Sequence, residues 1–474
     1  MTEYGYRLGG EERKDGEPLV VRSCWDGREV GVTFRPPREA LAEAVRLATA
    51  TAPAMAKLPS HARAELLRRM ADSVSHGAAE FVRMLALEAG KPVKAGRVEV
   101  ERCVFNLRHA AEEAQRIESE LLPLDLLPSG EKRWGLVRRF PAGPVLAITP
   151  FNFPLNLVTH KLAPAFASGN TVVQKPASKT PLCSLMLGRV AAESGLLEGA
   201  LSVVPCSASD AEELVADPRF GLVTFTGSAA VGWSLREKAG RKRVTLELGG
   251  NAGVIVHDDA DIEDAASRCT AGGFSYAGQS CISVQRIFVQ SRAFPRFRDA
   301  LVDRVKALVV GDPLDERTDV GPMISADEVR RVADWVEEAR RQGAQILAGG
   351  APGDGQVYLP TVLTGTRPSM RVNCEEIFGP VVTVEPYESF QEALEAVNQS
   401  RYGLQAGVFT CDVRKIFHAF EVLEVGGVVA NDVPTYRADH MPYGGVKDSG
   451  VGREGIRYAI EEMTERRILV LNLR

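Results

Sequence analysis

The sequence predicts an α/β protein built from two α/β units, and three observations support this prediction. Its 474 residues correspond to about three domain-sized segments at roughly 150 residues each. From residue 143 onward, short apolar stretches alternate with helical ones, which is typical of a parallel sheet covered by helices. A second alternating block begins near Ala252, so a second sheet is expected.

The N-terminal part is predicted to be helical. Residues 39–57, 61–89 and 97–119 place apolar side chains three and four positions apart, as amphipathic helices do. The stretch LLPLDLLPSG at 121–130 contains too much proline to continue a helix. We therefore expect a break before the alternating region begins.

The strands of both units are expected where apolar runs are short and bounded by turn residues. The first unit should contain strands at 144–149, 171–174, 201–204, 222–226 and 244–248. The second should contain strands at 253–256, 286–290, 381–385 and 407–409.

Two further segments, 132–141 and 468–472, alternate like strands but belong to neither unit. They could pair with each other, or with a neighbouring subunit as an added edge strand.

Composition excludes several classes of protein. Lys plus Arg number 57 against 62 Asp plus Glu, so there is no global positive charge for nucleic acid. The N-terminus lacks an apolar signal core, and no run approaches the about 20 apolar residues of a membrane span. The eight cysteines form no CxxC pair, so neither a disulfide scaffold nor a metal site is expected. A reducing cytoplasm is the expected setting.

One glycine motif is misleading. Gly450, Gly452 and Gly455 spell GxGxxG, the dinucleotide fingerprint. That fingerprint needs a strand before it and a βαβ unit around it, whereas only 19 residues follow Gly455. We interpret this motif as a loop that enters a helix at 456–465.

A more credible nucleotide site follows the strand at 222–226. Gly227 and Ser228 lead into a helix, whose free N–H groups and positive end suit a diphosphate. The strand at 171–174 ends in Lys175, with Ser178 three residues later, which suits a ribose or phosphate. The same residues also fit a simple helix cap and a solvated loop.

Cys281 is the best candidate nucleophile, because it lies in a glycine-marked loop between a helix and a strand. Most cysteines are small buried hydrophobes, and the other seven fit that description. Glu247 ends a strand and precedes two glycines, so it is a candidate base. The Asn152 amide, also after a strand, could donate to an oxyanion. Together with a nucleotide cleft, these residues indicate covalent acyl chemistry coupled to hydride transfer.

Seven segments now identify a resemblance to the aldehyde dehydrogenase superfamily over essentially the whole chain. Within it, the PYGGVKDSG stretch is most similar to the lactaldehyde-dehydrogenase-like branch. The matching segments are TPFNFP (149–154), GNTVVQKPAS (169–178), FTGS (225–228), ELGGN (247–251), GQSCIS (278–283), EEIFGP (375–380) and MPYGGVKDSG (441–450).

The resemblance implies roles for individual residues. Cys281 would be the nucleophile, Glu247 the general base, Asn152 the oxyanion donor and Lys161 part of a proton relay. Substrate would meet Arg102, Phe153, Ser280 and Ile282, and the cofactor would meet Thr149, Pro150, Phe151, Lys175, Ser178, Gly227, Ser228, Leu248, Glu376 and Phe378.

The resemblance also implies a cofactor. NAD-preferring relatives usually carry a glutamate at the position of Ser178, where it would repel the 2′-phosphate of NADP. We therefore expect NADP to be preferred, with NAD as a slower substitute.

Further implications concern the reaction. Relatives that pass the acyl group to coenzyme A lack a glutamate at the position of Glu247, so oxidation with hydrolysis to the acid is expected here. Relatives acting on phosphorylated aldehydes carry arginine where this chain has Ser280, although Arg102 matches a second anion-binding arginine of theirs. A semialdehyde or glyceraldehyde-3-phosphate dehydrogenase is therefore the alternative. From other classes, a cofactor-independent cysteine thioesterase or a non-catalytic binding protein would share the fold.

The implied architecture has a Rossmann-like cofactor domain, a catalytic domain and a small β segment for oligomerisation. The expected ranges are 1–122 with 142–248 for the cofactor domain, 249–440 for the catalytic domain, and 123–141 with 441–474 for the oligomerisation segment. The family builds dimers, often paired as tetramers, so a homo-oligomer is expected.

Overall fold

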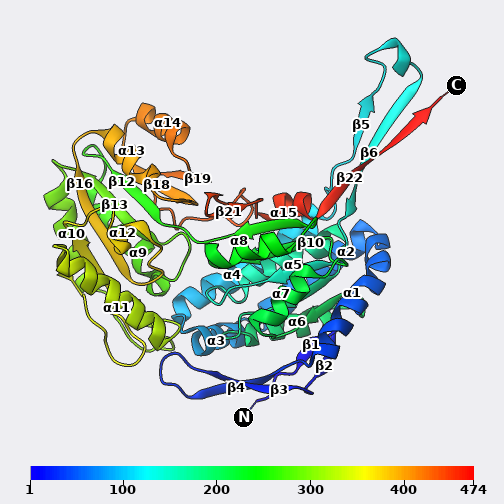
Figure 1. Ribbon diagram of the computed structural model, residues 1–474, viewed down its shortest axis with the longest axis horizontal. Helices are drawn as coiled ribbons and strands as arrows, with labels where there is room; N and C mark the ends of the chain where they lie inside the picture. The colour runs from blue at the N-terminus through cyan, green and yellow to red at the C-terminus, as the bar shows by residue number, and fades with distance from the viewer. Residues whose placement is uncertain (1, 474) are drawn as a thin grey trace.

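The computed structural model describes residues 2–473 and arranges them as two α/β units with a projecting β arm (Figure 1). The first unit contains an eight-stranded sheet whose inner strands are parallel, with antiparallel strands at both edges. Its spatial order is β2 (Glu11–Arg13), β1 (Tyr6–Leu8), β9 (Leu201–Val203), β8 (Val172–Lys175), β7 (Val145–Ile148), β10 (Leu222–Thr226), β11 (Arg243–Glu247) and β21 (Gly450–Val451).

Helices cover this sheet and bury its central strands. Every residue of β7 and β10 is buried, as expected for parallel strands covered on both faces. The helices of this unit are α1 (Arg38–Lys57), α2 (Ser60–His76), α3 (Ala78–Ala89), α4 (Val93–Glu113), α5 (Asn156–Ser168), α6 (Leu182–Glu193), α7 (Ala208–Ala216), α8 (Ala229–Lys238) and α15 (Ile456–Glu462).

The single helix expected at 61–89 is two helices, and this part of the prediction is wrong. The break lies at Gly77, which ends α2 and begins α3 with φ −87° and ψ 11°. A glycine has no Cβ to favour the helical conformation, so it provides a natural end there. The helix expected at 97–119 is α4, which begins earlier, after Pro92, and ends at Glu113.

The second unit contains a seven-stranded sheet that is parallel except for β14. Its order is β14 (Gln345–Ala348), β15 (Thr361–Thr364), β16 (Val381–Tyr387), β13 (Val284–Gln290), β12 (Ala252–Val256), β18 (Gln405–Phe409) and β19 (Gly427–Ala430). Its helices are α9 (Ile262–Phe274), α10 (Phe294–Lys306), α11 (Ala326–Arg341), α12 (Arg371–Cys374), α13 (Phe390–Asn398) and α14 (Val413–Val422), with the short turn η2 (Ser275–Gly278) after α9.

Small sheets connect these units. The hairpin of β3 (Glu17–Arg22) and β4 (Glu29–Arg35), dark blue at the bottom of Figure 1, runs below the first unit. Strand β17 (Tyr402–Gly403) pairs with β20 (Val446–Lys447) and ties the second unit to the C-terminal region. Strands β1 to β4 were not among the predicted strands.

The β arm projects from the first unit and carries the C-terminus (Figure 1). It consists of β5 (Glu120–Pro123), the turn η1 (Pro128–Gly130), β6 (Arg133–Pro141) and β22 (Thr464–Asn472). Ile468 lies opposite Val137 in the antiparallel pair of β6 and β22, which confirms that the two unassigned segments pair with each other. Within 441–474, β21 and α15 pack on the first unit rather than on the arm.

Large apolar side chains on the arm are exposed to solvent. They include Leu121, Leu126, Leu127, Trp134, Ile468, Leu469, Val470 and Leu471. Contiguous exposed apolar surface of this kind marks an interaction site. No helix within residues 2–473 combines the length and apolar character needed to cross a membrane.

We predict that truncation after Arg467 disrupts self-association. The deletion removes the outer half of β22, including its exposed apolar residues, and leaves β6 with an unpaired edge. Light scattering should find a homo-oligomer for the intact chain and monomers or insoluble protein for the truncated chain. A monodisperse monomer of the intact chain would contradict this prediction.

Candidate active site

The candidate site begins at one edge of the first sheet, where its parallel strands end. Ile148 of β7 lies beside Lys175 of β8, and Thr226 of β10 lies beside Glu247 of β11. The carboxyl ends of parallel strands form the usual ligand crevice of α/β folds. The register thus brings the predicted residues after all four strands to one edge.

The start of α8 fits a diphosphate. Ser228 occupies the N-cap position with φ −70° and ψ 148°, and its hydroxyl caps no backbone N–H of the helix. Leu248 packs against the same helix, because a Cβ added to Gly232 would lie 2.3 Å from the Leu248 side chain. The N–H groups of the first turn, next to Gly227, therefore remain free to bind an anion.

Two rings and a carboxylate lie farther along the edge. The rings of Phe151 and Phe378 meet edge to face with centroids 5.8 Å apart. Phe378 has φ 47°, an uncommon conformation that turns this loop toward the first unit. Glu376 accepts a hydrogen bond from the Gly250 N–H at 2.9 Å, and burial raises the pKa of Glu376 to about 7. The resemblance assigns Glu376 and Phe378 to a nicotinamide ribose and ring, and the structure sets them against Gly250 and Phe151.

The opposite end of the edge is basic. Lys175 is half-buried, and burial lowers its pKa. Ser178 and Lys179 are exposed and line a cavity of about 410 Å³ together with Arg22 and Arg35. Thr149 and Pro150 precede Phe151 on the adjoining loop, and the Thr149 hydroxyl accepts a hydrogen bond from Gln174 at 3.0 Å.

The Cys281 loop is held in a strained conformation next to Asn152. Tyr276 and Ala277 have φ of 50° and 53°, and Gly278 has φ 68°. A Cβ on Gly278 would lie 2.2 Å from the Gly379 carbonyl oxygen, so only glycine fits there. The Asn152 amide donates to the Gln279 carbonyl at 3.0 Å, which places this amide at the loop.

Cys281 itself lies against Tyr443. Its Sγ is 3.1 Å from the Tyr443 hydroxyl, and Ile282 packs with Tyr443 and Leu404 behind the thiol. A Cβ on Gly250 would lie 2.2 Å from the Cys281 carbonyl oxygen, so this loop abuts the end of β11. Burial raises the pKa of Cys281 to about 12, and the hydrogen bond with Tyr443 opposes that rise. Ser280, just before the thiol, is half-buried.

Glu247 points into the site without a fixed partner. Only 4% of the residue is exposed, and among the described residues neither carboxyl oxygen has a hydrogen-bond partner. Burial raises the pKa of Glu247 well above its ordinary value, and the charge of Glu454 raises it further. A buried carboxyl group with free oxygens suits a base that acts through a water molecule.

A buried ion network lies beside these groups. The Lys161 ammonium donates to Thr224 at 2.9 Å and to Glu454 at 3.2 Å. The Arg437 guanidinium donates to the other Glu454 oxygen at 2.9 Å and lies 3.7 Å from the centroid of the Tyr443 ring. Burial raises the pKa of Glu454, but Lys161 and Arg437 outweigh it and hold that pKa at about 2.

The network continues to Arg102. Its guanidinium donates twice to Asp439, at 2.8 and 2.6 Å, and His160 lies 2.8 Å from the same carboxylate. Burial raises the pKa of Asp439, but His160 and Arg102 outweigh it and hold the pKa well below its usual range. Burial also lowers the pKa of His160, and the carboxylate of Asp439 opposes that decrease. We call Arg102, His160, Lys161, Arg437, Asp439 and Glu454 the cleft network.

The structure therefore brings Cys281, Glu247 and Asn152 together where the two units meet, and Phe153 packs there against Tyr276. Sequence reasoning missed Tyr443, Arg437, Asp439, Glu454 and His160. All of these except His160 lie within the matching segment at 441–450 or within four residues of it, so position was their only available signal. Their partners come from distant parts of the chain, which no local pattern indicates.

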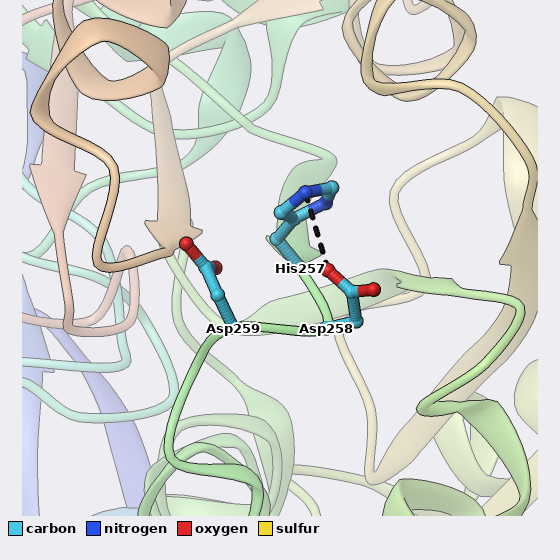
Figure 2. Close-up of side chains that lie close together, drawn as sticks. All are labelled: His257, Asp258 and Asp259. Atoms are coloured by element: carbon cyan, nitrogen blue, oxygen red, sulfur yellow. Dashed lines mark ion pairs between the residues drawn. The ribbon is translucent and has the colours of Figure 1, made fainter.

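A separate polar cluster lies at the end of β12 in the second unit (Figure 2). His257 lies 3.3 Å from Asp258 and hydrogen-bonds the Tyr387 hydroxyl at 2.8 Å. Asp259 accepts hydrogen bonds from Thr410 and from the Cys411 N–H. These protein partners account for the cluster, and nothing else in it points to a metal ion.

Fold and site together define an oxidoreductase of the cysteine-dependent type that binds a nicotinamide cofactor. The chain belongs to the aldehyde dehydrogenase family, whose pattern it matches over residues 12–469.

Individual members of the family are similar to this chain over nearly its whole length. The chain is 45% identical to 3-sulfolactaldehyde dehydrogenase of Priestia aryabhattai, over 100% of this chain and 99% of the relative. Aldehyde dehydrogenase 21 from Physcomitrella patens, solved with the reaction product succinate, has a TM-score of 0.98 and 41% identity, covering 100% of this chain and 99% of its own. Glyceraldehyde-3-phosphate dehydrogenase from Methanocaldococcus jannaschii, complexed with NADP, has a TM-score of 0.92 and 37% identity, with 97% and 99% covered.

The raised pKa values predict how the rate depends on pH. The pKa values of Cys281 and Glu247 lie above their ordinary ranges, so raising the pH populates the reactive, ionised forms of both groups. We expect kcat/KM to rise between pH 7 and 9, by up to about tenfold per unit. Initial-rate assays in buffers of different pH and constant ionic strength would measure this profile. A flat or falling profile would contradict the assignment of these two groups.

Proposed function

We propose that this protein oxidises a short anionic aldehyde to the carboxylic acid, with NADP as the preferred cofactor and water as the acyl acceptor. The observation that carries the proposal is the cleft network beside Cys281, which holds more positive than negative charge. The alternative is a neutral hydroxyaldehyde of the lactaldehyde type.

In the proposed mechanism, the Cys281 thiolate adds to the aldehyde carbon and forms a thiohemiacetal. The Asn152 amide and the Cys281 backbone N–H donate hydrogen bonds to the developing oxyanion. Each such donor is worth about 2.7–4 kcal/mol in enzymes of this kind. In the structure the Asn152 amide is already at the Cys281 loop, which supports this role.

The bound nicotinamide cofactor supplies the hydride acceptor for the oxidation. Glu247 then takes a proton from a water molecule, which attacks the Cys281 thioester and releases the acid. The free oxygens of Glu247 leave room for that water. Lys161 and Glu454 share a contact of 3.2 Å, and the charges of both act on the pKa of Glu247, which supports a part for Lys161 in the proton relay.

The charge of the cleft network favours an anionic substrate. It contains three cations, Arg102, Lys161 and Arg437, and two ionised carboxylates, Asp439 and Glu454. An uncompensated charge away from water is unfavourable, so an anionic group on the aldehyde would stabilise the site. Two of the relatives above are named for a sulfonated and a phosphorylated aldehyde, and the third was solved with the reaction product succinate, which supports the same class.

Substitution of Arg437 should test the substrate class. We expect Arg437→Met to reduce kcat/KM for anionic aldehydes, such as succinate semialdehyde, by at least about tenfold relative to lactaldehyde, because the charge excess disappears. Arg108→Met is the matched control, since Arg108 is an exposed arginine on α4 that pairs with Asp72. A wild-type enzyme that prefers lactaldehyde, or an equal loss for both substrates, would favour the alternative.

Preference for NADP is proposed from Ser178. Its hydroxyl can donate to a 2′-phosphate, and the cavity that it shares with Lys179, Arg22 and Arg35 is basic. A glutamate at this position would repel the phosphate by like charge.

We therefore predict that Ser178→Glu raises the KM for NADP at least about tenfold, equivalent to about 1.4 kcal/mol. The KM for NAD should change little or fall, because NAD lacks the 2′-phosphate. Steady-state kinetics with both cofactors on the wild type and this variant provide the measurement. Strict NAD dependence of the wild type would refute the preference.

The setting and assembly are part of the same proposal. All eight cysteines are free thiols, which suits a reducing cytoplasm. The exposed apolar face of the arm supports a homo-oligomer, either a dimer or a tetramer. The proposed domains are 1–122 with 142–248 for the cofactor and 249–440 for catalysis, with 123–141 and the C-terminal strand β22 forming the oligomerisation arm, because β21 and α15 pack on the first unit. A thioesterase or a non-catalytic protein would need neither the free helix start at Ser228 nor the paired rings of Phe151 and Phe378.

A further inference from the structure

Lys91 occupies an unusual position between the two units. It lies in the short connection between α3 and α4, with 1% of the residue exposed. Its ammonium lies 3.6 Å from the centroid of the Phe153 ring and 4.5 Å from that of Tyr276. The two rings, themselves edge to face at 6.2 Å, come from the Asn152 loop and the Cys281 loop.

A buried carboxylate fixes this lysine. Lys91 forms an ion pair with one oxygen of Glu99 on α4. The other oxygen of Glu99 accepts the backbone N–H groups of Leu155 and Asn156, each at 3.0 Å. Glu99 thus holds Lys91 and the start of α5, three residues beyond Asn152, in one arrangement.

The two aromatic residues are attached to the reacting groups. Phe153 follows Asn152, the proposed oxyanion donor. Tyr276 has φ 50°, a sparsely populated conformation that needs support from surrounding contacts, and its hydroxyl donates to the Ala89 carbonyl at 2.7 Å. A desolvated cation attracts the faces of both rings and draws the two loops together.

We infer that Lys91 is a positioning residue whose contacts with Phe153 and Tyr276 set the distance between the Asn152 amide and the Cys281 thiol. Lys91 contacts neither reacting group directly, so it acts through the two loops. The inference rests on the oxyanion role proposed for Asn152. It gives the buried Lys91–Glu99 ion pair a role in positioning the reacting groups in addition to its role in packing.

The main test neutralises the pair without changing its shape. In the double variant Lys91→Met with Glu99→Gln, the amide oxygen can still accept the Leu155 and Asn156 N–H groups. We expect kcat to fall at least about tenfold, with KM for aldehyde and NADP within about twofold, because misplacement affects the transition state more than binding. Lys94→Met is the matched control, since Lys94 is an exposed lysine on α4 paired with Asp319.

A mutant cycle that combines the double variant with Asn152→Ala distinguishes a positioning role of Lys91 from a general structural defect. Without the Asn152 amide, the double variant should lower kcat further by less than about twofold, because the positioned donor is already absent. An unchanged kcat for the double variant, or the same loss in both backgrounds, would overturn the inference. Wild-type turnover by Asn152→Ala would instead refute the proposed mechanism itself.

If the double variant does not fold, a second pair of variants at Tyr276 tests the same inference. Tyr276→Phe keeps the ring over Lys91, whereas Tyr276→Leu removes it. We expect kcat to fall at least about fivefold more for leucine than for phenylalanine, in proportion to a lost cation–π contact. Equal activities of the two variants would overturn the inference.

Discussion

Burial of charge at the junction of the two units is the constraint on which the site depends. Ionised groups removed from water must be paired or hydrogen-bonded, and the partners here come from segments far apart in the chain. Glu454 joins Lys161 of α5 to Arg437, whose guanidinium lies on the Tyr443 ring beside Cys281. A change in any one of these groups therefore alters the surroundings of the thiol.

The same constraint explains the electrostatics of the reacting groups. Glu454 keeps its charge because two cations contact it, and that charge in turn raises the pKa of Glu247. Cys281 lies where burial disfavours the thiolate. Burial thus favours the neutral forms of Cys281 and Glu247, and the excess of positive charge in the cleft network is available to an anionic group on the substrate.

The loops of Asn152 and Cys281 carry the proposed reacting groups at this junction, and buried neighbours hold each loop in place. The loop of Asn152 follows a fully buried strand, while that of Cys281 depends on left-handed residues and a glycine that no other residue could replace. Lys91 lies between them with Phe153 on one side and Tyr276 on the other. Rigid support of this kind is what preorganised catalysis requires.

The alternation of apolar runs was enough to predict the two sheets, because burial on both faces makes each central strand a short hydrophobic run. Cys281, Glu247 and Asn152 could be proposed as site residues from the sequence, since each lies in a recognisable local segment after a strand or a helix, and the structure places them close together. Arg437, Asp439 and Lys91 were not, because a lone charged residue usually lies in solvent. Only the tertiary structure decides that these three are buried, since their partners lie far away in the sequence and the cost of burying a charge depends on those partners.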